Sequence, residues 1–572
     1  RSARRRKAER GSEVPIRHRR HRVALVPLDD RPCNVNAPRG LAGLVDYEVV
    51  VPQRPWLGRF GLPGNCDEVG AWLRRVAATV DCAVVSLDML AYGGLIASRT
   101  TRTPLDAARR RLESLREIKA NSPGASIFAS NVIMRSSISG SEDTSGKDWA
   151  QVQRYSELRD LVQRFGREQD RDELGELRKE LPQEVLSEYL GARERNHAIN
   201  CLAVELAADG TIDWLALTQE DASEHGIHRQ EQEALQALIQ ERGVEDMVMI
   251  YPGADEASMT LLARFVQVHM LRVPKIAVAF SSAEHAQRIA PFEDRPLAQT
   301  VVEHIAAVGA EQADGADEAD IRCFVNAPVG FTRQELRESD ELQKQRRAEL
   351  EGFVADIAAQ LDEERPTVVC DVAFANGADP VLIDLLFEHA NVCRLASYAG
   401  WNTAGNSIGS ALAHGVMRMI ALQDKGAFEL AGRLRSFDTM HYLGLLDSLI
   451  ASERKHQELL VSRLVDDWAY QTDVRERAAA YMADRVRRSA FDLADGHEEA
   501  EQFVRAQLGH AAQELYLNHF LGRRCVRIGA GQRTAYLVPS ELEEMHIALP
   551  WGRLFEVEVG FGFGMQLVGE EC

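Results

Sequence analysis

The 572-residue sequence has no apolar run that approaches the ~20 residues needed to cross a bilayer, and no charged-then-apolar signal peptide opens it. It also lacks any Cys-x-x-Cys pair or His-x-x-x-His spacing. Its nine cysteines are widely spaced, and several lie in runs typical of buried strands. These absences argue against a membrane protein, a disulfide-stapled secreted domain and a structural zinc site. We therefore expect a cytoplasmic protein that binds no membrane.

Positive charge is scarce beyond the first residues. The net charge is −20, yet residues 1–22 carry ten Lys or Arg against two Glu, a surplus of +8 that leaves −28 for the rest. A body of this charge should repel nucleic acid and anionic membranes, so we expect no nucleic-acid partner. The basic tail, residues 1–22, has almost no apolar residues and is predicted to be disordered.

Strand-like runs alternate with helical stretches from Arg22 to about residue 430. The ten runs are RVALVPLD, YEVVVP, DCAVVSLD, ASIFASNVIM, TIDWLALT, EDMVMIYP, PKIAVAFS, IRCFVNAP, PTVVCDVAF and CRLASYA. This alternation predicts an α/β fold with a largely parallel sheet built from βαβ units. Ten strands are too many for a simple eight-stranded barrel. The sheet is therefore either barrel-like with extra strands or divided into two α/β units that meet near residue 265.

The pattern changes after residue 430. Residues 431–520 show helical periodicity, and two later strings, CVRIGAGQRTAYLVP and HIALPWGRLFEVEVGFGFGMQL, predict a small β region. A chain of this length exceeds the size of a single core. We therefore expect an α/β catalytic region at 23–430, with a helical insert at about 149–208, followed by a helical segment and small sheet at 431–572.

Four strings share one feature: a strand-like run ends in carboxylates and is followed by a turn. They are LVPLDDRPCN (25–34), VVSLDMLAYGG (84–94), LTQEDASEHG (217–226) and YPGADEAS (251–258). Because ligands bind at the carboxyl ends of strands in parallel α/β folds, the pattern predicts an active site. A single acid there can instead cap the next helix. Capping explains less well the adjacent pairs Asp29/Asp30, Glu220/Asp221 and Asp255/Glu256.

The paired acids are the candidate catalytic groups. Adjacent acids on an extended segment point in different directions, so one can orient a substrate while its neighbour transfers a proton. We predict Glu256 as the acid/base and Asp255 or Asp221 as the orienter or nucleophile. Glu220, crowded by Asp221, has the surroundings that raise the pKa of a general acid. Together with Asp88, the same acids could alternatively hold a hard divalent cation.

Further polar residues are predicted to bind substrate. Arg31 could clamp an anion or simply neutralise the neighbouring acids. Trp401 lies among glycines and amides, a setting that suits stacking on a sugar ring or a phosphate cradle. The stretch lacks the glycine order and lysine of nucleotide-binding loops. The substrate-binding candidates are Asp29, Asp30, Arg31, Asp88, Asn131, Arg193, Asn196, Asn376, Asp379, Trp401, Asn402 and Asn406.

Seven strings in order resemble the uncharacterised bacterial domain-of-unknown-function 4127 family. They are LDDRPCN, SLDMLAYGGLIASR, ARERNHAIN, LTQEDASEHG, YPGADEASMTLLAR, DVAFANGAD and YAGWNTAGNSIG. The resemblance spans about residues 23–420 and extends toward the C-terminal part. It implies a cytoplasmic bacterial protein, but it carries no activity. Glu220 departs from the family's pattern, in which Asp is expected in the paired-acid motif.

These observations favour a hydrolase, and the leading hypothesis is a glycoside hydrolase that acts on a small-molecule or oligosaccharide substrate without a cofactor. One alternative is a metal-dependent hydrolase of amides or phosphoesters, with the same acids as ligands to a divalent metal. The other is a non-catalytic sugar-binding or regulatory protein. Loss of activity on chelation would indicate the metal-dependent hydrolase. Ligand binding without turnover would indicate the non-catalytic protein.

Overall fold

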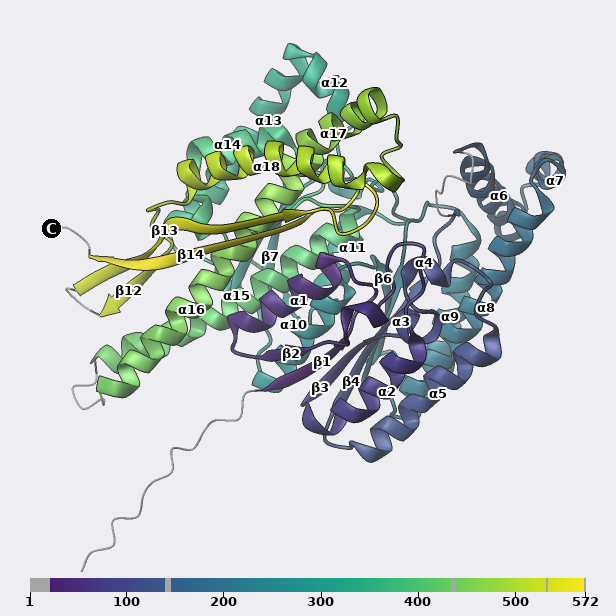
Figure 1. Ribbon diagram of the computed structural model, residues 1–572, viewed down its shortest axis with the longest axis horizontal. Coiled ribbons are helices and arrows are strands. Elements are labelled where there is room, and N and C mark those ends of the chain that lie inside the picture. The colour runs from purple at the N-terminus through teal and green to yellow at the C-terminus, as the bar shows by residue number, and fades with distance from the viewer. Residues whose placement is uncertain (1–20, 139–145, 434–438, 531–532, 570–572) are drawn as a thin grey trace, which may run out of the picture.

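The computed structural model describes residues 21–138, 146–433, 439–530 and 533–569. A first parallel sheet occupies one end of the molecule and has the order β2-β1-β3-β4-β5-β6 (Figure 1). Its strands are β1 (Arg22–Val26), β2 (Glu48–Val50), β3 (Cys82–Ser86), β4 (Ser126–Ile133), β5 (Trp214–Gln219) and β6 (Val248–Pro252). Residues 1–20 of the predicted disordered tail lie outside the described residues.

A second parallel sheet follows, with the order β11-β10-β9-β7-β8. Its strands are β7 (Lys275–Phe280), β8 (Glu311–Gln312), β9 (Ile321–Asn326), β10 (Thr367–Asp371) and β11 (Ser397–Ala399). The predicted α/β class is therefore confirmed, and the chain forms two open sheets instead of a barrel. All ten predicted runs contain a strand. The additional strand, β8, was not predicted. It has only two residues, both exposed and polar, so it lacks the apolar pattern that identifies a strand.

Side chains that alternate along the strands explain how helices cover the first sheet. Val23 and Leu25 of β1 pack with α1 (Pro32–Leu44) and α10 (Ala257–Met270) on one face. Ala24 and Val26 face the opposite core, which is completed by a second set of helices. That set is α2 (Cys66–Val76), α3 (Leu87–Tyr92), α5 (Leu105–Asn121), α8 (Gln183–Ala208) and α9 (Ile227–Arg242), and α4 (Leu95–Ser98) follows α3.

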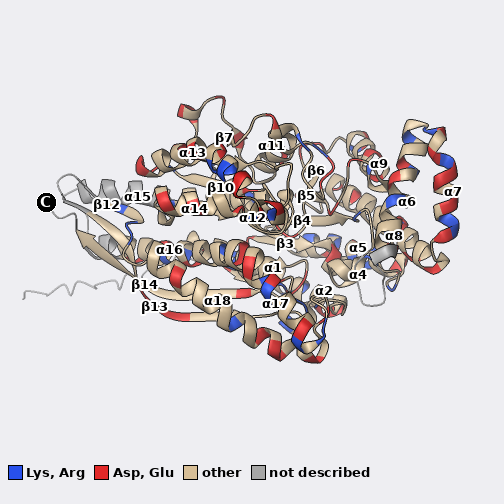
Figure 2. Ribbon diagram, turned by 90° about the horizontal axis from the view of Figure 1, so that it is seen from above, with Lys and Arg blue, Asp and Glu red and all other residues tan. Residues whose placement is uncertain are grey.

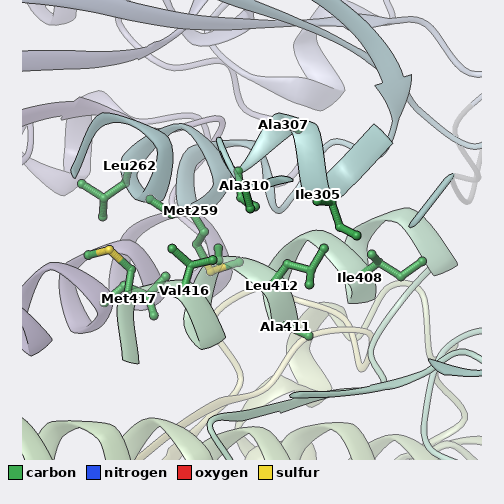
Figure 3. Close-up of a cluster of buried hydrophobic side chains, with 14 of the residues drawn as sticks. Met259, Leu262, Ile305, Ala307, Ala310, Ile408, Ala411, Leu412, Val416 and Met417 are labelled. Carbon is green, nitrogen blue, oxygen red and sulfur yellow. The ribbon is translucent and has the colours of Figure 1, made fainter. Parts of the chain in front are cut away.

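Helix α15 (Ala404–Arg433) joins the two α/β units. Figure 3 shows its side chains Ile408, Leu412, Val416 and Met417 against residues of α10 and the α11 (Leu297–Ala307) region. Small residues let α15 approach closely: a Cβ added to Gly409 would lie 2.3 Å from Cγ of Glu256. The carboxyl end of β6 is therefore packed directly against the second unit.

The other face of the second sheet is covered by α13 (Asp340–Asp362) and α14 (Pro380–His389), and α12 (Arg333–Glu338) precedes them. The chain between β4 and β5 forms α6 (Gly146–Phe165), α7 (Arg171–Glu180) and α8. Of these helices, α6 and α7 project from one end of the molecule (Figure 1), and α7 is strongly charged in Figure 2.

The C-terminal part packs on the second unit. It consists of α16 (Thr439–Leu464), a π-helix η7 (Val465–Val474), α17 (Arg475–Tyr481) and α18 (His497–His519). An antiparallel sheet follows, with β12 (Val526–Ala530), β13 (Arg533–Ala548) and β14 (Glu558–Gly569). The predicted helical segment and small β region are thus confirmed. The turn between β13 and β14 reaches back to the first α/β unit, where Arg59, in the loop before α2, donates to the carbonyl of Pro550.

The eight cysteines in the described part of the chain are all free thiols, and only Cys33 and Cys201 are not buried. No helix in the described ranges is both long enough and apolar enough to span a bilayer.

Candidate functional site

Arg31 gathers two of the predicted acids at the end of β1. Its guanidinium donates to Asp29 (Nε to Oδ2, 2.9 Å) and to Asp255 (Nη1 to Oδ2, 3.1 Å). All three side chains are at least 95% buried. Burial raises the pKa of Asp255 to about 6 against the lowering effect of Arg31. Of the two roles predicted for Arg31, the structure shows the neutralising one.

Two asparagines from the second unit hold the turn that carries Asp255. Asn402 Nδ2 donates to Asp255 Oδ2 over 3.1 Å. Asn406 Oδ1 accepts the backbone N–H groups of Ala254 and Asp255 at 3.1 and 2.9 Å. Two predicted strings, PGADE and GWNTAGN, therefore meet across the junction of the two sheets. The contacts of Asn402 and Asn406 position Asp255 and the backbone beside it.

Glu256 faces the core between α10, α11 and α15. Its side chain is fully buried, Oε2 accepts the N–H of Ala254 at 2.8 Å, and Oε1 lies 3.7 Å from His304 Nε2. Gly409 of α15 packs against its Cγ. A proton donor must reach its substrate. Glu256, 0% exposed, is therefore a poor candidate for the predicted acid/base, and its contacts brace the β6 turn.

The second predicted acid pair is also held by arginines. Arg99 donates to Glu220, and Arg135 Nη2 lies 2.5 Å from Asp221 Oδ2. Asp221 has a backbone φ of +23°, which is unusual for a residue other than glycine. Asp88, nearby, accepts the N–H of Val132 at 2.9 Å. Burial raises the pKa of Asp88 to about 7.

Three predicted binding residues link α8 to β4, to the residue that follows β4 and to α4. Asn131 donates to Asn200 at 2.6 Å, and Asn196 donates to the carbonyl of Ser98 at 2.9 Å. Arg193 donates to the carbonyl of Met134 at 3.0 Å and pairs with Glu231 of α9. These contacts are all within the protein and fasten the helical insert to the first sheet.

The remaining candidates are dispersed. Asp30 accepts from Trp551 Nε1 at 2.6 Å. Asp379 caps α14 by accepting the N–H of Val381, and it pairs with Arg346. Asn376 has a φ of +57°, and its backbone N–H donates to the carbonyl of Asn402. Among the predicted residues, only Trp401 lines the pocket described next.

A pocket of about 110 Å³ lies between α1, α16, η7 and the β13–β14 turn. One wall is Trp401, and much of the remaining surface is apolar. Its lining residues are Pro32, Cys33, Asn36, Ala37, Trp401, Leu459, Ser462, Arg463, Asp466, Glu556, Val557 and Val559. We call it the Trp401 pocket. It adjoins the group formed by Arg31, Asp29 and Asp255, which we call the Arg31 cluster, because Arg31 Nη1 lies 3.7 Å from Glu556 Oε1.

Two carboxylates of the Trp401 pocket have contrasting surroundings. Asp466, half-buried, accepts a hydrogen bond from Gln471 at 3.0 Å, and burial raises its pKa to about 6. Glu556 is close to two guanidinium groups, since Arg553 Nε donates to its Oε2 at 2.8 Å and Arg31 Nη1 lies 3.7 Å from its Oε1. Glu556 is thus hydrogen-bonded to an arginine, whereas Asp466 has no such ion pair among the described residues, and the nearby charges of Arg463 and Arg475 only partly offset the effect of burial on its pKa.

Sequence reasoning missed both of these acids. Asp466 and Asp467 form an adjacent pair like those at the strand ends, but they occur within a helical pattern. Glu556 follows the PWG turn, 90 residues later in the chain. Only the fold brings the two into one pocket. In the part of the chain that the structure describes, no three His, Cys, Asp or Glu side chains form a group that could hold a metal ion.

Comparison with known proteins gives one match. Residues 23–560 match the family described as "Protein of unknown function (DUF4127)". The chain belongs to this family. The match includes the C-terminal part as well as both sheets, so the Trp401 pocket lies entirely within the DUF4127 region. Neither a curated protein nor a solved structure matched the chain.

Proposed function

We propose that this DUF4127 protein is a glycoside hydrolase whose sugar substrate binds in the Trp401 pocket. Asp466 is the proton donor to the leaving oxygen, and Glu556 is the second carboxylate, acting as nucleophile or as base toward water. The observation that carries the proposal is the contrast between these two acids on one pocket. Glycosidases need one carboxyl that keeps a proton near neutral pH and one that stays charged.

The surroundings of Asp466 support its role as the acid. With a pKa of about 6, about half of this carboxyl is protonated at pH 6 and roughly a tenth at pH 7. Glu556 supports the complementary role because the guanidinium groups of Arg553 and Arg31 lie close to it. A developing positive charge on a sugar ring would be stabilised by such a fixed carboxylate.

The shape and lining of the Trp401 pocket indicate the substrate class. An indole wall beside hydroxyl- and amide-binding groups is suited to a sugar ring, which has apolar C–H faces and polar edges. The volume of about 110 Å³ is smaller than the roughly 300 Å³ or more of pockets for drug-sized ligands. The pocket would therefore receive one terminal sugar or its substituent, and the rest of the substrate would extend into solvent.

The Arg31 cluster gives the strand-end acids an indirect role. Asp29 and Asp255 fix the position of Arg31, and Arg31 in turn contacts Glu556. In this proposal Asp255 keeps one of its two predicted roles, that of an orienting residue. It orients Glu556 through Arg31 instead of orienting the substrate directly. Trp401 keeps its predicted role in substrate binding.

Initial rates on a panel of aryl glycosides, including N-acetylhexosaminides, test the proposal. They are measured with and without EDTA for the wild type and for Asp466→Asn and Glu556→Gln. Asp484→Asn, an exposed acid paired with Arg485, is the matched control. We expect turnover that survives chelation, falls by about 10²-fold or more in the two pocket variants and is unchanged in the control.

Other outcomes would overturn the proposal in distinguishable ways. Turnover that EDTA abolishes would indicate a metal-dependent hydrolase. Sugar binding by calorimetry without turnover of any glycoside would indicate a non-catalytic binding protein. Equal rates in Asp466→Asn and the wild type would remove the acid assignment even if a glycoside is hydrolysed.

A further inference from the structure

One buried amide connects the two acids of the Trp401 pocket. Gln471 is 1% exposed, and its Nε2 donates to Asp466 Oδ1 at 3.0 Å and to the carbonyl of Phe555 at 3.3 Å. Phe555 is the residue before Glu556. A carboxamide nitrogen has two N–H groups, so one side chain can serve both acceptors. The amide thus ties η7 to the β13–β14 turn at the point where each contributes a carboxylate.

The orientation of this amide is fixed from its other side. Arg475 Nη1 donates to Gln471 Oε1 at 2.6 Å. Because a guanidinium has no acceptor, the amide oxygen must face Arg475 and the NH₂ group must face Asp466. Gln471 can therefore only donate to the Asp466 carboxyl, and a donor favours the charged form of an acid.

The π-helical geometry of η7 explains why Gln471 reaches Asp466. The two residues are five positions apart. In an α-helix of 3.6 residues per turn, five positions advance by about 1.4 turns, which places the side chains on different faces. A π-helix forms i to i+5 hydrogen bonds, so residues five apart lie nearly above one another. The rare helix type, Val465–Val474, is therefore what aligns the two side chains.

We propose that Gln471 is a positioning residue that holds the Asp466 carboxyl in the Trp401 pocket and links it to the turn that carries Glu556. The proposal rests on the proposed function for the importance of Asp466 in catalysis. Its structural content, a donor that acts on Asp466, can be measured without any substrate.

Removing the donor should make Asp466 harder to ionise. Without the Gln471 N–H, the Asp466 carboxylate loses a stabilising hydrogen bond, so its pKa should rise. We expect the titration midpoint of Asp466 to move upward by about one pH unit in Gln471→Ala. Gln471→Met keeps the length of the side chain but removes the donor without adding a charge, and it should shift the midpoint in the same direction.

The titration is followed by NMR on the full chain with ¹³C-labelled aspartate carboxyls, and the Asp466 signal is identified by its loss in Asp466→Asn. Gln457→Ala is the matched control: Gln457 is also a fully buried amide on a helix, and it donates to the carbonyl of Cys393 and to Glu453 outside the pocket. In the control, we expect the Asp466 midpoint to stay within about 0.2 units of the wild type.

An unchanged Asp466 midpoint in folded Gln471→Ala or Gln471→Met would overturn the proposal, as would an equal shift in Gln457→Ala. If Gln471→Ala does not fold, Gln471→Met decides. Rates on the glycoside panel separate the two proposals. An upward shift with no glycoside turned over supports the positioning role and refutes the glycosidase. With turnover, kcat should fall in Gln471→Ala while KM changes less than about threefold.

Discussion

Most strand-end acids of this protein are paired with arginines. Arg31 forms ion pairs with Asp29 and Asp255, and Arg99 forms one with Glu220. Burying a charged side chain without a partner is strongly unfavourable, and an arginine beside it offsets much of that free energy. Acids that lie buried between two units therefore need such partners. A carboxylate pair in the sequence is therefore ambiguous by itself. It indicates catalysis only where one member is hydrogen-bonded to a neutral group and lines a pocket, as Asp466 does.

Glu293 is the buried acid whose ionisation should most affect stability. It accepts the N–H of Gly405 at 2.8 Å, and burial raises its pKa to about 8. Its pKa is about 4.5 in the unfolded chain, so between pH 4.5 and 8 the folded protein binds one more proton. The free energy of unfolding should therefore fall with rising pH across this window, by up to about 1.4 kcal/mol per pH unit.

Replacing Glu293 by glutamine should remove this contribution. Glutamine keeps the acceptor for Gly405 but cannot ionise, so Glu293→Gln should gain stability relative to the wild type between pH 5 and pH 8. Urea unfolding at pH 5, 6.5 and 8 measures the difference. Glu176→Gln, an exposed residue, is the control and should leave the pH dependence as in the wild type. Parallel pH profiles for Glu293→Gln and the wild type would show that Glu293 is ionised throughout.

At the scale of elements, regular strands were predictable and η7 was not. Each strand run is a short block of apolar, β-branched residues, so the local sequence suffices to identify it. Nothing in VDDWAYQTDV distinguishes a π-helix from an α-helix, because the choice depends on how the segment packs against the rest of the fold. The candidate site was missed for the same reason. Trp401 was identified, whereas Asp466 and Glu556 reach the pocket through the tertiary fold.

The close packing of α15 gives a prediction at this scale. A Cβ at Gly409 would lie 2.3 Å from Glu256 Cγ and 3.0 Å from His304 Cδ2, so Gly409→Ala should destabilise the protein by roughly 1–3 kcal/mol. Alanine has the higher helix propensity, and this effect alone would act in the opposite direction. Urea unfolding at neutral pH gives the change in free energy.

Gly444 on α16 is the matched control, because nothing lies within 4 Å of a Cβ added there. Gly444→Ala should be neutral or stabilising by up to about 1 kcal/mol. If the two substitutions change stability in the same direction, the contact of α15 with the β6 turn is looser than the structure shows.

At the scale of the whole molecule, the candidate site depends on parts that are far apart in the chain. The Trp401 pocket takes Cys33 from the first unit, Trp401 from the second, and Asp466 and Glu556 from the C-terminal part. The turn between β13 and β14 closes it. Trp551, 1% exposed, lies with its ring centroid 5.0 Å from the Arg31 guanidinium and donates to Asp30, which is 521 residues away in sequence. The site therefore exists only when the C-terminal turn is docked on the first sheet.

Weakening that docking should expose Cys33, the pocket's only thiol. Trp551→Phe keeps an aromatic ring but removes the N–H that Asp30 accepts, a hydrogen bond to a charged group of roughly 1.5–3 kcal/mol. Transient opening of the turn should then increase by about tenfold or more. We expect the alkylation of Cys33 by iodoacetamide to accelerate in proportion, since an opening that is fast and rare controls the rate. Peptide mass spectrometry measures this rate.

Cys201 provides an internal control in the same molecule, because it is the other half-buried thiol in the described part of the chain and lies on α8, among side chains of the first unit. Its alkylation rate should be the same in Trp551→Phe and the wild type. Acceleration at both cysteines would mean global loosening, and acceleration at neither would mean that the turn is held without the Trp551 hydrogen bond. Acceleration at Cys33 alone would show that the C-terminal turn closes one side of the pocket. This closure is what lets residues from three regions of the chain act on one ligand.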